Sequence, residues 1–247
     1  MIYSLAEIFG IVCIVYASSR CFRFLAGAIL ALLMTHGGED AVDDIGCTKC
    51  GKHDYGRHTS QDQCLVLGPY SFINVVGGKE QFDDEGRSYK NLIEVAVVMT
   101  ILNNMHKATW LTSKHEFNIG IVTSYAGQVA AIQEKLGKIY ESDDRFNVVV
   151  SSVDGFQGGE KDNIMLSTIR TSSRSSLEFI SSPQRTNVAL TRARHCLWIL
   201  GNERAITNNE NVWKATVLDA KNRKCFFNAD QDVEMAKAIL DSKKKAY

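Results

Sequence analysis

The sequence predicts an α/β fold in three layers, with a mostly parallel sheet between two layers of helices. Two observations support this prediction: short runs of Val, Ile and Leu alternate with longer segments of helical periodicity, and 45% of the residues are apolar. Near-continuous apolar runs are typical of strands buried on both faces, and the amphipathic segments between them are typical of the helices that cover those faces. A chain of 247 residues is long enough for one domain with a sizeable core.

Each expected strand is a short apolar run that ends at a polar or glycine-containing segment. Strands are expected at residues 70–76, 119–122, 146–150, 164–169 and 196–200. Helices are expected at residues 88–105 and 127–139 and after Pro183. Two further helical periods follow residue 208, with apolar faces formed by Trp213, Val217 and Leu218 and by Met235, Ile239 and Leu240.

Composition changes divide the chain into four segments. These are an apolar, helical leader at residues 1–35, a polar linker at 36–66, the α/β domain at 67–228 and a helical tail at 229–247. Each uncharged stretch of the leader is about a dozen residues, shorter than the roughly 20 that span a bilayer, and Arg20 and Arg23 lie between the stretches. No basic residue precedes the first apolar run, as a secretory signal would require. We expect a helical hairpin within a larger assembly or a non-native leader, with membrane association as the minor alternative.

Neither the overall charge nor the cysteine content indicates a particular partner or metal. The chain has 28 basic and 28 acidic side chains, so any nucleic-acid surface would have to arise from local clustering. Seven cysteines, an odd number in a mid-sized chain, favour a reducing compartment. Cys47 and Cys50 form one Cys-x2-Cys pair followed by His58 and Cys64, but this spacing only approximates a zinc knuckle. Zinc is therefore not expected, and reduced thiols are the favoured interpretation.

The loop at residues 152–160, Ser-Val-Asp-Gly-Phe-Gln-Gly-Gly-Glu, lies between two expected strands. Its glycines let the backbone approach a ligand closely, and Asp154, Gln157 and Glu160 supply hydrogen-bonding side chains. Ligands of parallel α/β sheets bind at loops that follow strand ends. The segment is therefore a candidate binding loop, and an ordinary turn is the alternative.

Residues 185–193, Arg-Thr-Asn-Val-Ala-Leu-Thr-Arg-Ala, are expected to be helical. Arg185 and Arg192 are separated by about two helical turns and would share one face of this helix. Guanidinium groups suit phosphate because they stay charged and donate hydrogen bonds in pairs. The alternative is a solvated helix face or surface ion pairs.

Three segments in this order and spacing resemble motifs IV, V and VI of superfamily 1 helicases. They are residues 120–128 (Gly-Ile-Val-Thr-Ser-Tyr-Ala-Gly-Gln), 152–160 and 185–193. The resemblance is greatest to the subgroup that includes the nonsense-mediated-decay helicase and senataxin, and it covers roughly residues 68–232. Ser88, Asn91 and Glu94 resemble the start of that family's helix after its first strand. The resemblance implies the second, C-terminal RecA-like domain of such a helicase, a fold of the P-loop NTPase type.

This sequence departs from the family pattern at two positions. Ser124 stands where motif IV usually has Pro, and Ser152 stands where motif V usually has Thr. The first departure would loosen the end of a strand, and the second keeps the hydroxyl group. Neither removes the resemblance.

The resemblance implies roles in ATP binding, because the nucleotide of this family lies between two RecA-like domains. Arg192 resembles the motif VI arginine that reaches the γ-phosphate from across the cleft, and Arg185 is a second candidate for this catalytic role. Gln157, Gly158 and Glu160 resemble motif V residues at the ribose and phosphate side of the nucleotide. ATP with Mg²⁺ is the cofactor that the resemblance implies.

The resemblance also implies a single-stranded nucleic acid as partner. Ser152 and Val153 match the motif V pair that lies along the nucleic-acid backbone, and Tyr125 is a third candidate contact. A hydroxyl group and a backbone N–H can bind phosphate without reading sequence, so RNA and DNA are both possible substrates. The nucleus or the cytoplasm is the location implied by the family, with a membrane as the minor alternative.

The phosphate-binding half of an ATP site is not expected in this chain. Its three Gly-Lys pairs are followed by His53, Glu80 and Ile139, whereas a phosphate-binding loop needs Ser or Thr there. We therefore expect the chain to hydrolyse no ATP alone and to need a first RecA-like domain in cis or in trans. The alternative is a catalytically inactive module that binds single-stranded nucleic acid or protein.

Overall fold

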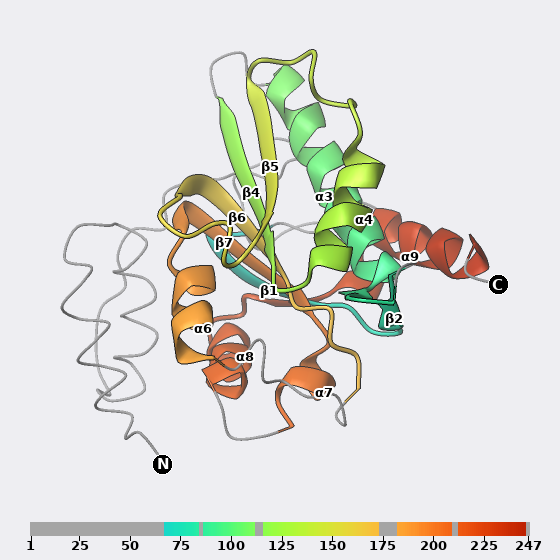
Figure 1. Cartoon of the computed structure of the whole chain (residues 1–247), viewed down its shortest axis with the longest axis vertical. Coiled ribbons are helices and arrows are strands. Elements are labelled where there is room, and N and C mark those ends of the chain that lie inside the picture. Colours follow the sequence, from blue (N-terminus) through green and yellow to red (C-terminus); the bar gives the residue numbers. More distant parts are fainter. Residues whose placement is uncertain (1–66, 84–85, 112–115, 173–181, 209–211, 246–247) are drawn as a thin grey trace.

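A computed structural model describes residues 67–83, 86–111, 116–172, 182–208 and 212–245. Its centre is a six-stranded parallel sheet with the strand order β5-β4-β6-β7-β1-β8 (Figure 1). The strands are β1 (Tyr70–Asn74), β4 (Phe117–Thr123), β5 (Phe146–Ser152), β6 (Lys161–Ser167), β7 (Ala193–Gly201) and β8 (Phe226–Asn228). A separate antiparallel pair consists of β2 (Gln81–Phe82) and β3 (Tyr89–Lys90). The predicted α/β fold with a mostly parallel sheet is confirmed.

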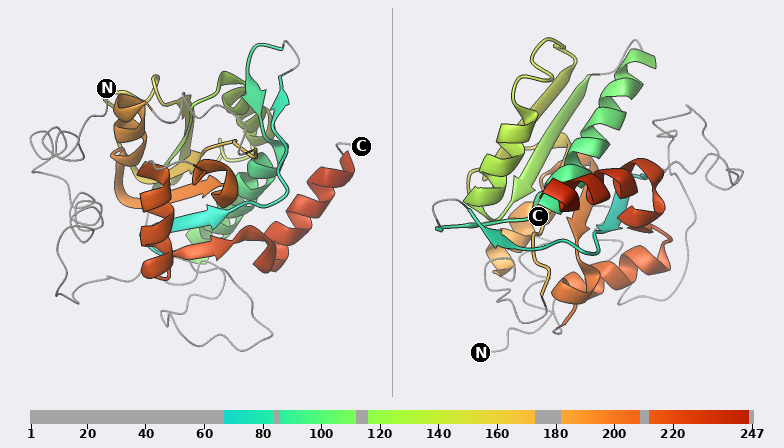
Figure 2. Two further views of the ribbon diagram at one scale, coloured as in Figure 1. Left: turned by 90° about the horizontal axis from the view of Figure 1, so that it is seen from below. Right: turned by 90° about the vertical axis from the view of Figure 1, so that its right-hand side faces the viewer.

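Helices cover both faces of the sheet, and Figure 2 shows the resulting three layers. One face packs against α3 (Leu92–Leu111), α4 (Ala126–Leu136) and α9 (Val233–Lys245). The other face packs against α6 (Pro183–Leu190) and α8 (Val212–Asn222). The short helices α7 (Glu203–Ile206) and η1 (Ala229–Gln231) connect elements near the end of the chain.

The core consists of two apolar clusters separated by the sheet, and alternate residues of the central strands enter each cluster. In β7, Trp198 and Leu200 pack on the side of α3, whereas Leu197 and Ile199 pack on the side of α6 and α8. Each of these four side chains is at most 3% exposed. Such a strand needs apolar residues at consecutive positions, which explains the continuous apolar runs in the sequence.

The predicted start of the helix at residue 88 is wrong by four residues. Tyr89 and Lys90 pair with β2 instead, and Asn91 caps the helix, because its side-chain oxygen accepts the backbone N–H groups of Ile93 and Glu94. The helix also runs to Leu111, beyond the predicted end at residue 105.

The helix predicted at residues 127–139 is α4, which ends three residues earlier than predicted. Gly137 ends it with φ 45°, and the Gly137 N–H donates to the Gln133 carbonyl.

Both apolar faces predicted for the tail are too wide. Trp213 and Val217 are buried, but Leu218 is 50% exposed; Met235 and Ile239 are buried, but Leu240 is 57% exposed. Leu218 and Leu240 each directly follow a buried residue, and consecutive helix positions differ by about 100° around the axis. The side chain one position further along therefore points to the solvent.

The predicted leader at residues 1–35 and linker at residues 36–66 lie outside the described residues, as do the zinc candidates Cys47, Cys50, His58 and Cys64. Among the helices of the described ranges, none is both long enough and apolar enough to cross a membrane.

Candidate functional site

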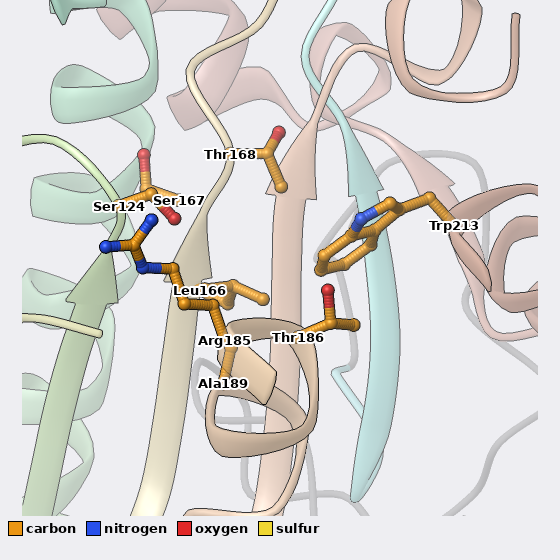
Figure 3. Close-up of a pocket in the computed structure, with 8 residues that line it drawn as sticks. All are labelled: Ser124, Leu166, Ser167, Thr168, Arg185, Thr186, Ala189 and Trp213. Carbon is orange, nitrogen blue, oxygen red and sulfur yellow. The ribbon is translucent and has the colours of Figure 1, made fainter. Parts of the chain in front are cut away.

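Polar side chains gather where β4, β5 and β6 end, which we call the carboxyl edge of the sheet. Because these strands are parallel, the segments that follow them meet at one edge. A hollow lies at this edge beside the start of α6, and Figure 3 shows the Arg185 side chain pointing toward Ser124 and Ser167 within it. The lining residues are Ser124, Leu166, Ser167, Thr168, Arg185, Thr186, Ala189 and Trp213.

Arg185 is fixed at the carboxyl edge by an ion pair with the loop that follows β5. Its Nε donates to Asp154 Oδ1 at 3.1 Å, and its Nη2 donates to Asp154 Oδ2 at 3.0 Å. These hydrogen bonds raise the pKa of Arg185, so the guanidinium keeps its charge. The surface ion pair considered as an alternative from the sequence is therefore present, and it joins the two segments that resemble motifs V and VI.

Arg192 does not share a helix face with Arg185, contrary to the prediction from their spacing. The helix α6 ends at Leu190, and Arg192 lies in the turn before β7 with 7% of its surface exposed. Its Nε donates to the Val188 carbonyl at 3.2 Å, and its Nη2 donates to Thr191 Oγ1 at 3.0 Å. The last carbonyls of a helix lack partners within the helix, and the guanidinium folds back onto one of them.

Arg192 instead lies beside Glu160 where β6 and β7 begin, which we call the amino edge of the sheet. The Lys161 N–H donates to the Arg192 carbonyl at 3.1 Å. Glu160 directly precedes Lys161, the first residue of β6, and therefore lies next to the turn that contains Arg192. The Glu160 carboxylate accepts a hydrogen bond from Arg194 Nε at 3.4 Å. This edge therefore combines exposed carboxylate and guanidinium groups with the backbone of two strand starts.

The other residues predicted to bind the nucleotide, Gln157 and Gly158, lie in the loop that runs from the end of β5 to the start of β6, and the Gln157 N–H donates to the Asp154 carbonyl at 3.3 Å. Gln157 and Gly158 are exposed, and Gly158 has φ 81°, in the left-handed region that favours glycine. A Cβ atom on Gly158 would meet nothing within 4 Å, so the backbone there is open to a ligand.

The predicted nucleic-acid contacts Ser152 and Val153 lie at the end of β5, on the carboxyl edge. Ser152 Oγ accepts the Gly155 N–H at 3.0 Å and thereby forms the turn that starts the loop. The Val153 side chain is buried, and its N–H donates to the Thr123 carbonyl at 2.9 Å. The Val153 N–H therefore has a partner within the sheet, contrary to the expectation that it is available to phosphate.

Tyr125, the third predicted contact, is a buried residue beneath the carboxyl edge. Its ring packs edge-on against Tyr89, with 5.9 Å between centroids, and the Arg170 guanidinium lies 5.1 Å from its centroid. Burial raises the pKa of Tyr125. A ring that is 8% exposed offers no face for stacking on a base, and Tyr125 supports the edge from inside.

A buried ionic group at the same edge could not be identified from the sequence. Arg170 follows β6, and its Nη1 lies 2.6 Å from Glu80 Oε2, with both side chains largely buried. Glu80 also accepts the backbone N–H groups of Thr171 and Ser172. The one available signal was an arginine immediately after a buried strand, because a charge at that position needs a partner.

Glu94 is the second important residue without a recognised role in the sequence, where it indicated only the start of a helix. It is completely buried, and its carboxylate accepts hydrogen bonds from Ser167 Oγ at 2.6 Å and from the Ile169 N–H at 3.0 Å. Burial raises the pKa of Glu94 to about 7. Among the described residues, no group of three or more His, Cys, Asp or Glu side chains could hold a metal ion.

Comparison with known proteins supports one family. The sequence profile of a family described as "AAA domain" matches residues 45–204. The helicase Sen1 of Saccharomyces cerevisiae is 30% identical over 167 residues, which cover 66% of this chain and 7% of that protein. The probable helicase senataxin of Homo sapiens is 36% identical over 156 residues, which cover 63% of this chain and 6% of that protein.

A regulator of nonsense transcripts 1 homolog from Neurospora crassa is 36% identical over 151 residues, which cover 60% of this chain and 13% of that protein. The chain therefore spans at most 13% of the length of these three relatives. Among solved structures, the C-terminal domain of a possible DNA helicase from Lactobacillus plantarum aligns with a TM-score of 0.36 and 12% identity, over 66% of this chain and 86% of that domain. That score is too low to bear on function.

Proposed function

The chain belongs to the superfamily 1 helicases, in the subgroup of the nonsense-mediated-decay helicase and senataxin, and we propose that it supplies the second RecA-like half of an ATP site and of a single-stranded nucleic-acid site. The observation that carries this proposal is the arrangement of the motif residues at two separate edges of one parallel sheet. Arg185 and Ser152 lie at the carboxyl edge, whereas Glu160 and Arg192 lie at the amino edge.

The amino edge is the proposed nucleotide half. The Glu160 carboxylate can accept hydrogen bonds from the ribose hydroxyl groups, and the Arg192 guanidinium and the open backbone at Gly158, in the loop that leads to this edge, can donate to the phosphates of ATP. Arg192 would leave the Val188 carbonyl and reach the γ-phosphate when a first domain closes against this edge. An arginine supplied in this way accelerates phosphoryl transfer by about 10³–10⁵. The phosphate-binding loop and the Mg²⁺ ligands would belong to the first domain.

The carboxyl edge is the proposed nucleic-acid half. The Arg185 guanidinium and the Ser124 and Ser152 hydroxyl groups supply donors that suit backbone phosphates and carry no base specificity. Single-stranded RNA and DNA are therefore both proposed substrates. The proposed location, nucleus or cytoplasm, rests on the family alone.

An inactive nucleic-acid-binding module is the second candidate function. It is favoured by the sequence observation that no Gly-Lys pair among the 247 residues precedes Ser or Thr. Such a module would use the carboxyl edge alone.

Phosphate release tests the proposal and separates it from the second candidate. The chain is assayed alone and mixed with the first RecA-like domain of one of its relatives, in the presence of a single-stranded oligonucleotide. We expect no turnover by the chain alone, turnover in the mixture, and a loss of about 10³-fold or more with Arg192→Ala. No turnover in the mixture would favour the inactive module, and turnover by the chain alone would contradict the half-site proposal.

A further inference from the structure

A fully buried polar network connects the start of α3 to the turn that follows β6. Glu94 accepts three hydrogen bonds: from Ser167 Oγ at 2.6 Å, from the Ile169 N–H at 3.0 Å and from Asn91 Nδ2 at 3.3 Å. Gln128 of α4 closes the network, because its amide group donates to Ser167 Oγ at 3.0 Å and its side-chain oxygen accepts the Asn91 N–H at 2.8 Å. An apolar side chain could pack α3 against the sheet at lower desolvation cost than a carboxyl group. Packing of α3 against the sheet therefore does not account for this network.

The network holds a backbone conformation that would otherwise be unfavourable. Ile169 has φ 69°, in the left-handed region that β-branched residues rarely adopt. Its N–H donates to Glu94, and its carbonyl accepts a hydrogen bond from Asn91 Nδ2 at 3.1 Å. Both polar groups of the strained peptide unit are thus held by the first residues of α3.

This turn places side chains around the hollow at the carboxyl edge. Ser167 is the last residue of β6 and Thr168 is the first residue after it, and both line the hollow together with Arg185 (Figure 3). Arg170, at the end of the turn, lies over the ring of Tyr125, which directly follows the lining residue Ser124. The positions of the segments after β4 and β6 therefore both depend on the path of residues 168–171.

We infer that Glu94 is a positioning residue for the carboxyl edge: it holds the turn after β6 so that Ser124, Thr168 and Arg185 surround one hollow. The inference rests on the proposed function, in which this edge receives phosphates of a single-stranded nucleic acid. Glu94 itself is completely buried and does not touch the ligand. It acts through the length of its side chain, which brings a hydrogen-bond acceptor to the Ile169 N–H.

Two substitutions separate this role from a contribution of charge or of stability. Glu94→Gln keeps the reach of the side chain and an acceptor oxygen, whereas Glu94→Asp keeps the carboxylate and shortens the reach. Met235→Ala in α9 is the control, because Met235 is buried in the apolar cluster on the α3 side of the sheet, whereas Ile169 of the turn belongs to the cluster on the other side. Affinity for a fluorescent 12-nucleotide oligo(U) or oligo(dT) is measured by anisotropy with the full chain. Amide exchange of Ile169 is measured in the same samples.

We expect Glu94→Asp to weaken binding about tenfold and to speed exchange of the Ile169 amide, because the shorter side chain no longer reaches the Ile169 N–H and the turn loses that hydrogen bond. Glu94→Gln should bind within about threefold of the wild-type chain, and Met235→Ala should not change affinity even where it lowers stability as much. Equal binding by Glu94→Asp and wild type, or equal losses for Glu94→Asp and Met235→Ala, would overturn the inference. If the wild-type chain binds neither oligonucleotide, the proposed function fails. Unchanged exchange of the Ile169 amide in Glu94→Asp would overturn the positioning role of Glu94, whatever the result for the proposed function.

Discussion

At the scale of single residues, the most informative feature is the buried Glu94 carboxyl group with its hydrogen-bonding partners. All three of its hydrogen-bonding partners described here donate to the carboxylate, and no charged group is among them. Donors alone do not offset the loss of solvation, so burial raises the pKa of Glu94 from 4.5 to about 7. The protonation state of this group consequently changes near neutral pH.

The buried Glu94 carboxyl group should make the stability of the chain depend on pH. Since the folded state binds the Glu94 proton more tightly than the unfolded state, this group makes the chain less stable as pH rises from about 4.5 to about 7. Glu94→Gln removes the titration, so the free energy of unfolding of the variant should vary less between pH 5 and pH 8. Urea unfolding of both proteins at these two pH values measures the difference. Equal pH dependence would show that Glu94 keeps an ordinary pKa in the folded chain.

Neither Glu94 nor Arg170 could be assigned to the site from the sequence, for a physical reason. Ser167 and Glu94 are 73 positions apart, and Arg170 and Glu80 are 90 positions apart. Such pairs exist only after the strands and helices have assembled. The motif positions Arg185, Glu160 and Ser152 were identifiable because each motif is a local pattern of residues.

The strands were the most predictable elements, because burial on both faces requires consecutive apolar residues. The runs at residues 119–122, 146–150 and 196–200 each fall within an observed strand. Helix ends were less predictable, since they depend on caps and tertiary contacts. Arg192 illustrates this limit: a helical period continued through residue 192, but α6 ends at Leu190.

The orientation of α9 predicts which of its apolar side chains contribute to stability. Met235 is 3% exposed and packs in the α3 cluster, whereas Leu240 is 57% exposed. Met235→Ala should lower the free energy of unfolding by roughly 2–4 kcal/mol, because it leaves a cavity between α9 and α3. Leu240→Ala is the matched control and should change it by no more than about 0.5 kcal/mol. Denaturant unfolding measures both, and a larger loss for Leu240→Ala would mean that α9 presents another face to α3.

At the scale of the whole molecule, α6 connects the two proposed halves of the site. Arg185 in its first turn lies at the carboxyl edge, and Arg192 just after its end lies at the amino edge. The helix has 8 residues and is therefore about 12 Å long, so it spans part of the distance between the two edges. A shift of this helix on closure of a first domain would move both arginines together, which offers a route for coupling nucleotide to nucleic acid.

The overall architecture followed from the sequence because alternating strand and helix patterns permit few topologies. A parallel sheet with helices on both faces was expected and is observed. The arrangement of the two arginines at different edges was not expected, because spacing on an ideal helix contains no information about where that helix stops.

The central claim is that the carboxyl edge binds nucleic-acid phosphate through Arg185, and the salt dependence of binding tests it most directly. Affinity for a single-stranded 12-nucleotide oligonucleotide is measured at several salt concentrations with the wild-type chain and with Arg185→Ala. We predict that wild-type binding weakens as the salt concentration rises. Arg185→Ala should bind more weakly than the wild-type chain, and the slope of log affinity against log salt concentration should be smaller in magnitude by about 1. Binding by Arg185→Ala that matches the wild-type chain at every salt concentration would contradict the claim.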